Sequence, residues 1–118
     1  MKVYNWDMIP EDSPRPGVRR RAIRSSNALV VRNEMDPGMQ TFPHRHDCEQ
    51  LVMIERGRVR FHVGDEIHTL GPGSVCVIPP GVMHFADPVG PETVINIDVF
   101  SPVREDYLHL VAYQEEKF

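Results

Sequence analysis

Short runs of valine, isoleucine and phenylalanine alternate with polar residues along most of the chain, and eleven prolines and eight glycines interrupt them. Apolar residues at every second position predict strands, because successive side chains of a strand point to opposite faces. The expected strands cover residues 20–24, 29–35, 50–55, 58–63, 66–70, 74–78 and 93–100. No helix-length segment separates neighbouring strands, so the sheet is expected to be antiparallel.

The two ends of the chain depart from this pattern. Residues 1–17 contain three prolines and several acidic or amide side chains, and they predict an extended arm. Residues 101–118 predict a short C-terminal helix, with Ser101 as N-cap and Pro102 in the first helical position. Beyond Val111 the chain becomes polar, and we expect the helix to fray there.

The expected strand 93–100 has two unlike faces. One face carries Val94, Asn96, Asp98 and Phe100, and the other carries Ile95, Ile97 and Val99. An aliphatic stripe left in water is costly, so a second sheet, the arm or a partner subunit should cover it. We therefore expect a homodimer that buries this stripe with help from residues 1–17. Asp98 would then face the interior of a barrel.

Length and charge narrow the class of protein. A chain of 118 residues is long enough for one domain, and it buries roughly two-thirds of its unfolded surface. The formal charge of −4 argues against nucleic acid as a partner, because such surfaces are usually basic. No apolar run approaches the roughly 20 residues that span a bilayer. The first residues lack the apolar core of a signal peptide, so a cytoplasmic location is expected.

Cysteine and arginine give weaker signals. Cys48 and Cys76 are too few for a disulfide scaffold, and we interpret both as packing residues; a thiolate ligand at Cys48 is the alternative. Arg19, Arg20, Arg21 and Arg24 form the basic cluster of the chain. A solvated face is its usual meaning, and the alternative is that Arg19 or Arg21 points inward toward an anionic ligand.

Three histidines carry the strongest chemical signal. His44 and His46 are one residue apart and would share one face of a strand. His84 arrives from a distant strand and could complete a cradle of three nitrogens, since neutral imidazole is the commonest metal ligand. The alternative is that these histidines only pack or trap a metal ion adventitiously.

The surrounding residues resemble the paired motifs of the cupins, which are small antiparallel barrels of jelly-roll (double-stranded β-helix) type holding one metal ion. The first motif runs from Gly38 through His44, His46 and Gln50 to Gly57, and the second from Gly73 through Pro79 and Gly81 to His84. Two positions depart from the family pattern: Gln50 replaces the usual glutamate ligand, and Pro88 replaces a terminal asparagine. The resemblance implies an all-β barrel binding one divalent ion (Zn, Ni, Fe or Mn) through His44, His46, Gln50 and His84.

A neutral set of four ligands leaves the full charge on the ion. This favours Lewis-acid work on a carboxylate or hydroxyl of a substrate. Two histidines and a carboxylate would instead have suggested an iron oxygenase. Gln50 therefore tilts the interpretation toward isomerase, lyase or hydratase chemistry.

A closer resemblance lies near the C-terminus. The segment Asp98-Val99-Phe100-Ser101-Pro102-Val103-Arg104 and the Glu105-Asp106 that follows are similar to the ending of the KdgF-type cupins of pectin and alginate breakdown. The resemblance implies conversion of 4,5-unsaturated uronate monosaccharides to a linear ketonised form, with Asp98, Phe100 and Arg104 taking part. It also implies a small anionic substrate, which arginine is suited to bind.

Two other functions stay open at this stage. One is a non-catalytic cupin that binds a small acid or sugar. The other is a different metal-dependent cupin enzyme, such as a dioxygenase, a cyclase or a lyase. Arg104 also has an alternative role, because its position allows an ion pair with Asp106 in place of a substrate contact.

Overall fold

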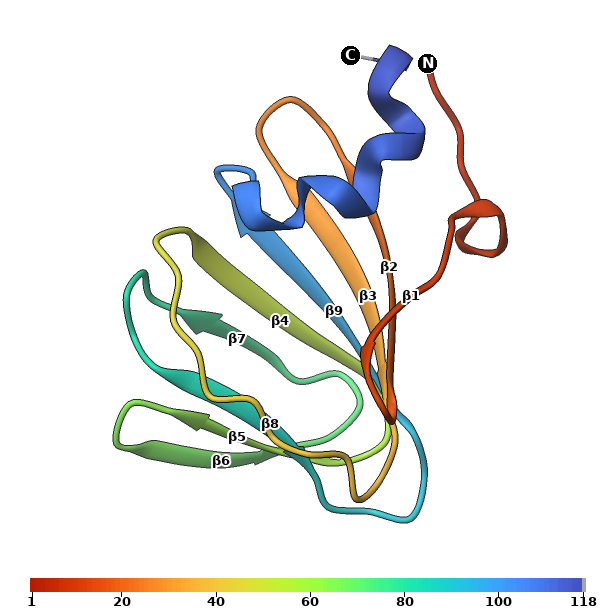
Figure 1. Ribbon diagram of the computed structural model, residues 1–118. Helices are drawn as coiled ribbons and strands as arrows, with labels where there is room; N and C mark the ends of the chain where they lie inside the picture. Colours follow the sequence, from red (N-terminus) through yellow and green to blue (C-terminus); the bar gives the residue numbers. More distant parts are fainter. Residues whose placement is uncertain (118) are drawn as a thin grey trace.

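The computed structural model describes residues 1–117, with side chains up to residue 115. Within this range two 3-10 helices flank a series of strands (Figure 1). In chain order the elements are η1 (Trp6–Met8), β1 (Asp12–Arg15), β2 (Val18–Arg24), β3 (Leu29–Met35), β4 (Glu49–Arg56), β5 (Val59–Val63), β6 (Glu66–Leu70), β7 (Val75–Ile78), β8 (His84–Pro88), β9 (Val94–Ser101) and η2 (Glu105–Lys117).

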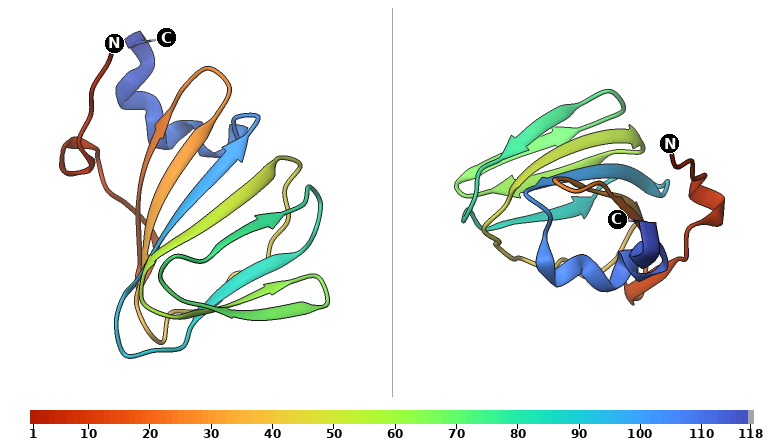
Figure 2. Two further views of the ribbon diagram at one scale, coloured as in Figure 1. Left: turned by 180° about the vertical axis from the view of Figure 1, so that it is seen from behind. Right: turned by 90° about the horizontal axis from the view of Figure 1, so that it is seen from above.

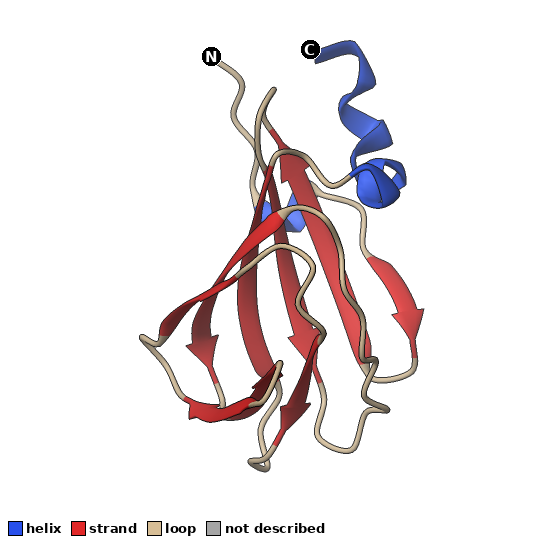
Figure 3. Ribbon diagram, turned by 90° about the vertical axis from the view of Figure 1, so that its left-hand side faces the viewer, coloured by secondary structure: helices blue, strands red, loops and turns tan. Residues whose placement is uncertain are grey.

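The strands form two sheets. The larger has the order β1-β2-β3-β9-β4-β7, and the smaller has the order β6-β5-β8. Every named strand pair is antiparallel, which confirms the prediction. The sheets face each other, and η2 crosses one end of the space between them (Figures 2 and 3). The fold is therefore the all-β jelly roll expected from the sequence.

The sequence pattern missed two strands, β1 and β8. Both lie at the edge of a sheet, and both contain proline, at Pro14 and Pro88. An edge strand leaves one set of backbone groups unpaired and tolerates proline, so it needs fewer alternating apolar residues. The arm predicted over residues 1–17 is thus extended in part, but it also contains η1 and the edge strand β1.

The predicted start of the C-terminal helix is wrong. Ser101 is the last residue of β9, and its hydroxyl donates a hydrogen bond to the carbonyl of Asn27 and does not cap a helix. The helix η2 begins only at Glu105 and is of the 3-10 type. Pairing of Ser101 with Glu49 of the neighbouring strand β4 keeps the chain extended up to this point.

The fraying predicted beyond Val111 does not occur at Tyr113 and Gln114, whereas Phe118 lies outside the described residues. The Tyr113 hydroxyl donates to the carbonyl of Ala22, and the Gln114 side chain binds the backbone N–H and C=O of Arg24 at 3.0 and 3.3 Å. Gln114 is almost fully buried. These bonds satisfy backbone groups at the end of β2 and fasten the helix to the sheet, which the polar composition of the tail concealed.

The inner face of the large sheet has an apolar zone at each end and a polar row between them. One apolar cluster fills the space between the sheets, and it includes Val18, Met35, Val52, Ile54, Val59, Phe61, Ile78 and Val94. The other lies under η2 and includes Ala22, Leu29, Val31, Phe100, Leu110 and Val111. Arg20, Asn33 and Asn96 are cross-strand partners between the two clusters. Polar side chains in a row on an inner face predict a binding site there.

The stripe of Ile95, Ile97 and Val99 lies on the opposite, outer face of the sheet. The second sheet packs against the inner face, so it does not cover the stripe, contrary to one of the three expected possibilities. Its outer neighbours include Leu51 on β4 and Val77 on β7, and Val77 is 57% exposed. The arm approaches this face through the ion pair of Glu11 with Arg21.

Gly57, between β4 and β5, packs closely against the backbone of Val94. Its φ of +80° favours glycine, and an added Cβ would lie 3.0 Å from Val94 Cα. Gly73 has a φ of +90° but would meet nothing within 4 Å, so it is a matched control. We expect Gly73→Ala to lower the free energy of unfolding by about 1–2 kcal/mol from backbone strain alone. Gly57→Ala should lose about 1–3 kcal/mol more, because backbone must move. Urea unfolding measures both, and equal losses would contradict the packing at Gly57.

Candidate metal centre and pocket

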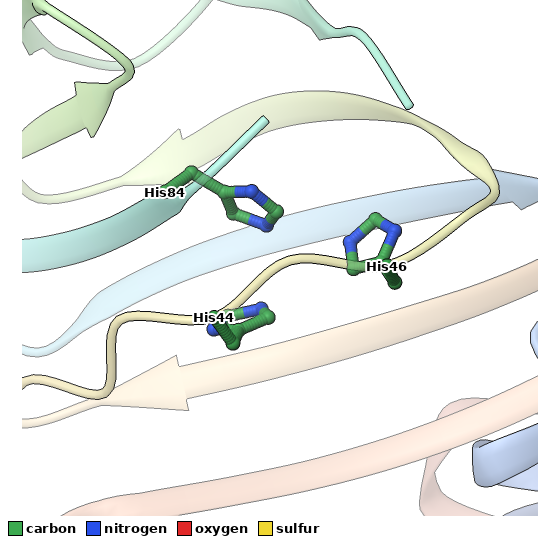
Figure 4. Close-up of side chains that lie close together, drawn as sticks. All are labelled: His44, His46 and His84. Atoms are coloured by element: carbon green, nitrogen blue, oxygen red, sulfur yellow. The ribbon is translucent and has the colours of Figure 1, made fainter. Parts of the chain in front are cut away.

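The three histidines of the two motifs meet in space (Figure 4). One ring nitrogen from each of His44, His46 and His84 lies within 4.8 Å of the others. His44 and His84 are joined by reciprocal backbone hydrogen bonds of 3.1 and 2.9 Å, so β8 begins beside the loop that precedes β4. The prediction that His44 and His46 lie on one regular strand is wrong, because only His44 forms an isolated bridge. The loop nevertheless turns both rings to the same centre.

Each of these imidazoles is held by a backbone carbonyl two residues away. Nδ1 lies 2.6 Å from the Phe42 carbonyl in His44, 2.9 Å from that of Cys48 in His46, and 2.8 Å from that of Val82 in His84. A carbonyl oxygen only accepts, so Nδ1 carries the proton in all three rings. Nε2 is then a lone-pair donor, as a metal ligand must be.

Burial keeps two of the rings neutral. It lowers the pKa of His84 to about 4, and it also lowers the pKa of His44, with a smaller opposing effect from the backbone carbonyl in each case. A neutral imidazole is the form that binds metal ions. His84 Nε2 is fully buried and has no hydrogen-bond partner among the described residues.

Gln50 completes the cluster from β4. Its Oε1 lies 3.0 Å from His46 Nε2. Its amide also interacts with the carboxylate of Asp98 and lowers the pKa of that group. Oε1 and the unprotonated Nε2 are both acceptors, and a cation beside them would satisfy both. The lone pairs, the orphaned His84 Nε2 and this contact fit a bound metal ion.

Asp98 lies beside this cluster on β9. Asn33 and Asn96 donate to its two oxygens at 2.8 and 2.7 Å. Burial raises the pKa of Asp98 to about 7, against the hydrogen bonds from Gln50 and Asn33 and the charge of Arg104. A carboxyl group at neutral pH with such a pKa can both give and accept a proton. Sequence reasoning placed Asn96 on the face of Asp98 without assigning it a role, and it missed Asn33, the cross-strand partner of Asn96.

Arg104 combines the two roles that the sequence left open. Its Nε and Nη2 donate to the Asp106 carboxylate at 2.8 and 2.9 Å. Its Nη1 is buried without a partner among the described residues. The guanidinium carbon lies 3.9 Å from the centroid of the Tyr107 ring. The ion pair therefore orients Arg104 and leaves Nη1, with its two N–H groups, for a ligand.

Phe100 lies behind the site and is almost fully buried. Its ring meets His46 edge-on, with 5.3 Å between centroids, and also meets Tyr107, at 5.7 Å. Only a small part of it reaches the cavity. Its main contribution is to support the His46 ring and the Arg104 guanidinium, which lies 5.2 Å from its centroid.

Arg19 and Arg21 lie on a solvated face, as the leading interpretation has it, so the alternative that one of them points inward is wrong. Arg19 pairs with Glu34 and Asp36 on the outer face, and Arg21 lies near Glu11. Arg20 points inward, because β2 buries Val18 and Ala22 on that face and Arg20 shares their parity. The alternation of Val18, Arg20 and Ala22 could have revealed this orientation.

These groups line one cavity of about 440 Å³ between the sheets. Its wall includes His44, Gln50, His84, Asp98, Phe100 and Arg104, together with Arg15, Arg20, Asn33 and Tyr107. This volume suits a small ligand such as a monosaccharide. Arg15, Tyr107 and Phe42 were missed by sequence reasoning, since β1 and the helix carry no periodic signal.

The cysteines are packing residues. Cys48 is buried in the cluster under η2, and Cys76 packs against the cluster between the sheets. The Cys48 Sγ lies 3.5 Å from the His46 Nδ1. That nitrogen is on the far side of the ring from Nε2, so Cys48 does not face the histidine cluster.

Two facing antiparallel sheets around a histidine-lined pocket define the cupin fold. The chain is similar to the structure of KdgF from Halomonas sp., with 27% identity, a TM-score of 0.80, and coverage of 89% of this chain and 98% of that one. It is also similar to an RmlC-like cupin from Shewanella frigidimarina, with 26% identity, a TM-score of 0.82, and coverage of 91% and 96%. The Cnp3 cupin domain of Schizosaccharomyces pombe shares the fold, at 12% identity and a TM-score of 0.73 over 91% and 73% of the chains.

The model of the AraC-like ligand binding domain matches residues 27–109. The chain therefore belongs to this family of cupins, and the resemblance read from its motifs is confirmed. None of the curated proteins matches the chain. Within residues 1–117, no helix has the length and apolar character that crossing a membrane requires.

The histidine cluster predicts metal content directly. Protein purified without a histidine tag should contain about one equivalent of a divalent transition metal by elemental analysis. The double variant His46→Ala, His84→Ala should lose it, because two of the three lone pairs are removed. His68→Ala is the control, since His68 is exposed and pairs with Glu66. Unchanged metal content in the double variant would disprove the site.

Proposed function

We propose that this protein is a metal-dependent enzyme that converts 4,5-unsaturated uronate monosaccharides, as released from pectin or alginate, to their linear ketonised form. One observation carries the proposal. Two histidines of the cluster, His44 and His84, the carboxyl group of Asp98 and Arg104 with its unpartnered Nη1 line the same cavity. A cation, a proton carrier and an anion-binding donor are the groups that this reaction needs.

The reaction is an isomerisation and needs no oxidant. A proton leaves the anomeric hydroxyl, the bond between C1 and the ring oxygen breaks, and C1 becomes an aldehyde. The ring oxygen becomes the C5 ketone when a proton reaches C4 of the enol ether. Proton transfer at two positions of one small substrate is thus the catalytic task.

The surroundings of Asp98 support its role in the proton transfer. Asn33 and Asn96 hold one oxygen each, so the carboxyl group cannot rotate away from the cavity. Gln50 links Asp98 to the histidine cluster. A glutamate at position 50 would set a second negative charge against Asp98, whereas the glutamine amide supplies a donor to it.

Arg104 and Phe100 serve binding. Asp106 occupies two of the three Arg104 nitrogens, and the third can donate to an oxygen of the substrate. Phe100 packs under that guanidinium and under the His46 ring, so it maintains their positions.

The ion would be held by His44, His46, Gln50 and His84, and Zn, Ni, Fe or Mn suit such a nitrogen and oxygen set. When bound, it supplies Lewis-acid polarisation of a substrate oxygen. The similarity to KdgF of Halomonas sp. over nearly the whole chain supports the proposal.

A second candidate is a non-catalytic cupin that binds a small acid or sugar. It is favoured by the family match, since that family is described as a ligand binding domain. The same cavity and the same cationic donors would serve binding alone. The two candidates differ in one observable, which is acceleration of the reaction.

The catalytic prediction uses the absorbance of the conjugated double bond of 4,5-unsaturated galacturonate. Protein with its metal should speed the decay of this absorbance above the spontaneous rate. Asp98→Asn should lower kcat about a hundredfold or more with metal content intact, as expected for a lost acid–base group. Arg104→Ala should mainly raise KM, and Phe100→Ala should have an intermediate effect.

Asp65→Asn is the control for the loss of a carboxylate, because Asp65 is exposed in the β5–β6 turn. It should leave kcat and KM unchanged. No acceleration by wild-type protein that contains metal would reject the enzyme and leave the binding module. Full activity in Asp98→Asn would reject the assigned role of Asp98.

We also propose that a second copy of the chain covers the outer face of the large sheet. Val99 on β9, Leu51 on β4, and Val75 and Val77 on β7 form the exposed part of this face, whereas Ile97 is already buried within the chain. Val75 and Val77 are 65% and 57% exposed. In a dimer with a two-fold axis, the same apolar patch of each subunit packs against that of the other, so both patches are buried in one interface.

Light scattering at micromolar concentration should therefore give twice the chain mass of 13.5 kDa. Replacing both valines of β7, Val75→Glu and Val77→Glu, should give a folded monomer, because unpaired charges would face each other in the dimer. Glu66→Lys on the exposed β6 strand is the control and should leave the dimer intact. A wild-type monomer would contradict the proposal.

A further inference from the structure

The β1–β2 hairpin brings two further guanidinium groups to the cavity. Arg15 ends β1 and Arg20 lies on the inner face of β2, and both line the cavity wall that Arg104 and Tyr107 share. The guanidinium carbons of Arg20 and Arg104 lie 4.7 and 3.9 Å from the centroid of the Tyr107 ring. Three cationic groups thus surround one part of the pocket.

The hydrogen-bond partners of these arginines differ. Asp106 occupies Nε and Nη2 of Arg104, which leaves a single nitrogen. Arg20 gives only its Nε to Asp12, at 2.7 Å, and Arg15 gives only its Nε to the carbonyl of Gln40, at 3.2 Å. Among the described residues, the terminal nitrogens of Arg15 and Arg20 donate no hydrogen bond. A carboxylate binds well to such paired N–H groups, and in Arg15 and Arg20 no described group of the protein uses either terminal nitrogen.

The ion pairs of these arginines also indicate an anionic ligand. Asp12 balances Arg20 and Asp106 balances Arg104, but no described carboxylate forms an ion pair with Arg15. Arg15 is partly buried, and burial lowers its pKa, with the Tyr107 hydroxyl opposing and the charge of Arg20 adding to that effect. Its guanidinium lies 5.1 Å from the Phe42 ring. One positive charge in the pocket therefore lacks a counter-charge.

We infer that Arg15 and Arg20 together recognise the carboxylate of the ligand, while Arg104 donates its one remaining nitrogen to another oxygen. This inference rests on the proposed function for the class of ligand, a sugar acid with one carboxylate. It adds that specificity for an acid over a neutral sugar comes from the β1–β2 hairpin. The pair distinguishes acids because a neutral hydroxymethyl group displaces water from these N–H groups without supplying a negative charge to pair with them.

Calorimetric binding to protein containing its metal tests the inference. Galacturonate and galactose differ at C6, where the first carries a carboxylate and the second a hydroxymethyl group. Wild-type protein should bind galacturonate at least about tenfold more tightly than galactose. Arg15→Gln and Arg20→Gln should each remove most of this preference. They should also make the affinity for galacturonate depend less on salt concentration. The affinity for galactose should stay within about twofold.

Arg19→Gln is the matched control, since Arg19 lies on the same strand but on the outer face. It should keep the preference. Arg20→Lys keeps the charge without the paired donors, and it should fall between wild type and Arg20→Gln. Thermal unfolding checks that each variant is folded.

Two outcomes would overturn the inference. One is a preference for galacturonate that survives in folded Arg15→Gln and Arg20→Gln but vanishes in Arg104→Gln. The other is a wild-type protein without any preference for the acid. The proposed enzyme can fail separately: a preference that depends on Arg15 and Arg20, without acceleration of the uronate reaction, supports the inference and rejects catalysis.

Discussion

The register of β3, β9 and β4 is the constraint on which the site depends. Because side chains alternate along each strand, this register puts Asn33, Asn96, Asp98 and Gln50 on one inner face and leaves the aliphatic stripe outside. A slip of one residue would exchange the two faces. The apolar clusters at both ends of the inner face oppose such a slip, since Val94 and Phe100 would both become exposed.

The site is pre-organised by backbone groups more than by side chains. Three carbonyl oxygens fix the tautomers of the histidines, and the two bonds between His44 and His84 tie the loop before β4 to β8. Gln50 then connects this cluster to Asp98. Fixing these groups before a ligand arrives lowers the reorganisation that binding or catalysis requires.

The helix η2 is anchored to the large sheet at one end and contributes to the cavity at the other. Tyr113 and Gln114 fasten it to β2, and Arg104 and Tyr107 at its other end reach the cavity. The same strand β2 supplies Arg20. One end of the cavity is therefore formed by segments far apart in the sequence, which explains why its cationic character was only partly predictable.

Much of the fold and of the metal cluster followed from the sequence alone. Alternation is a local property, so most strands were predicted within two residues, and glycine, proline and histidine spacing pointed to the cupin fold and to three histidines that meet. The tertiary structure alone decided the edge strands, the start and anchoring of η2, and the inward orientation of Arg20 in place of Arg19 or Arg21. Those features depend on partners distant in sequence. A strand lies at an edge because no further strand pairs with it, and Gln114 is anchored because it binds the backbone of β2. Which nitrogens of Arg15, Arg20 and Arg104 stay free depends on which carboxylates reach them.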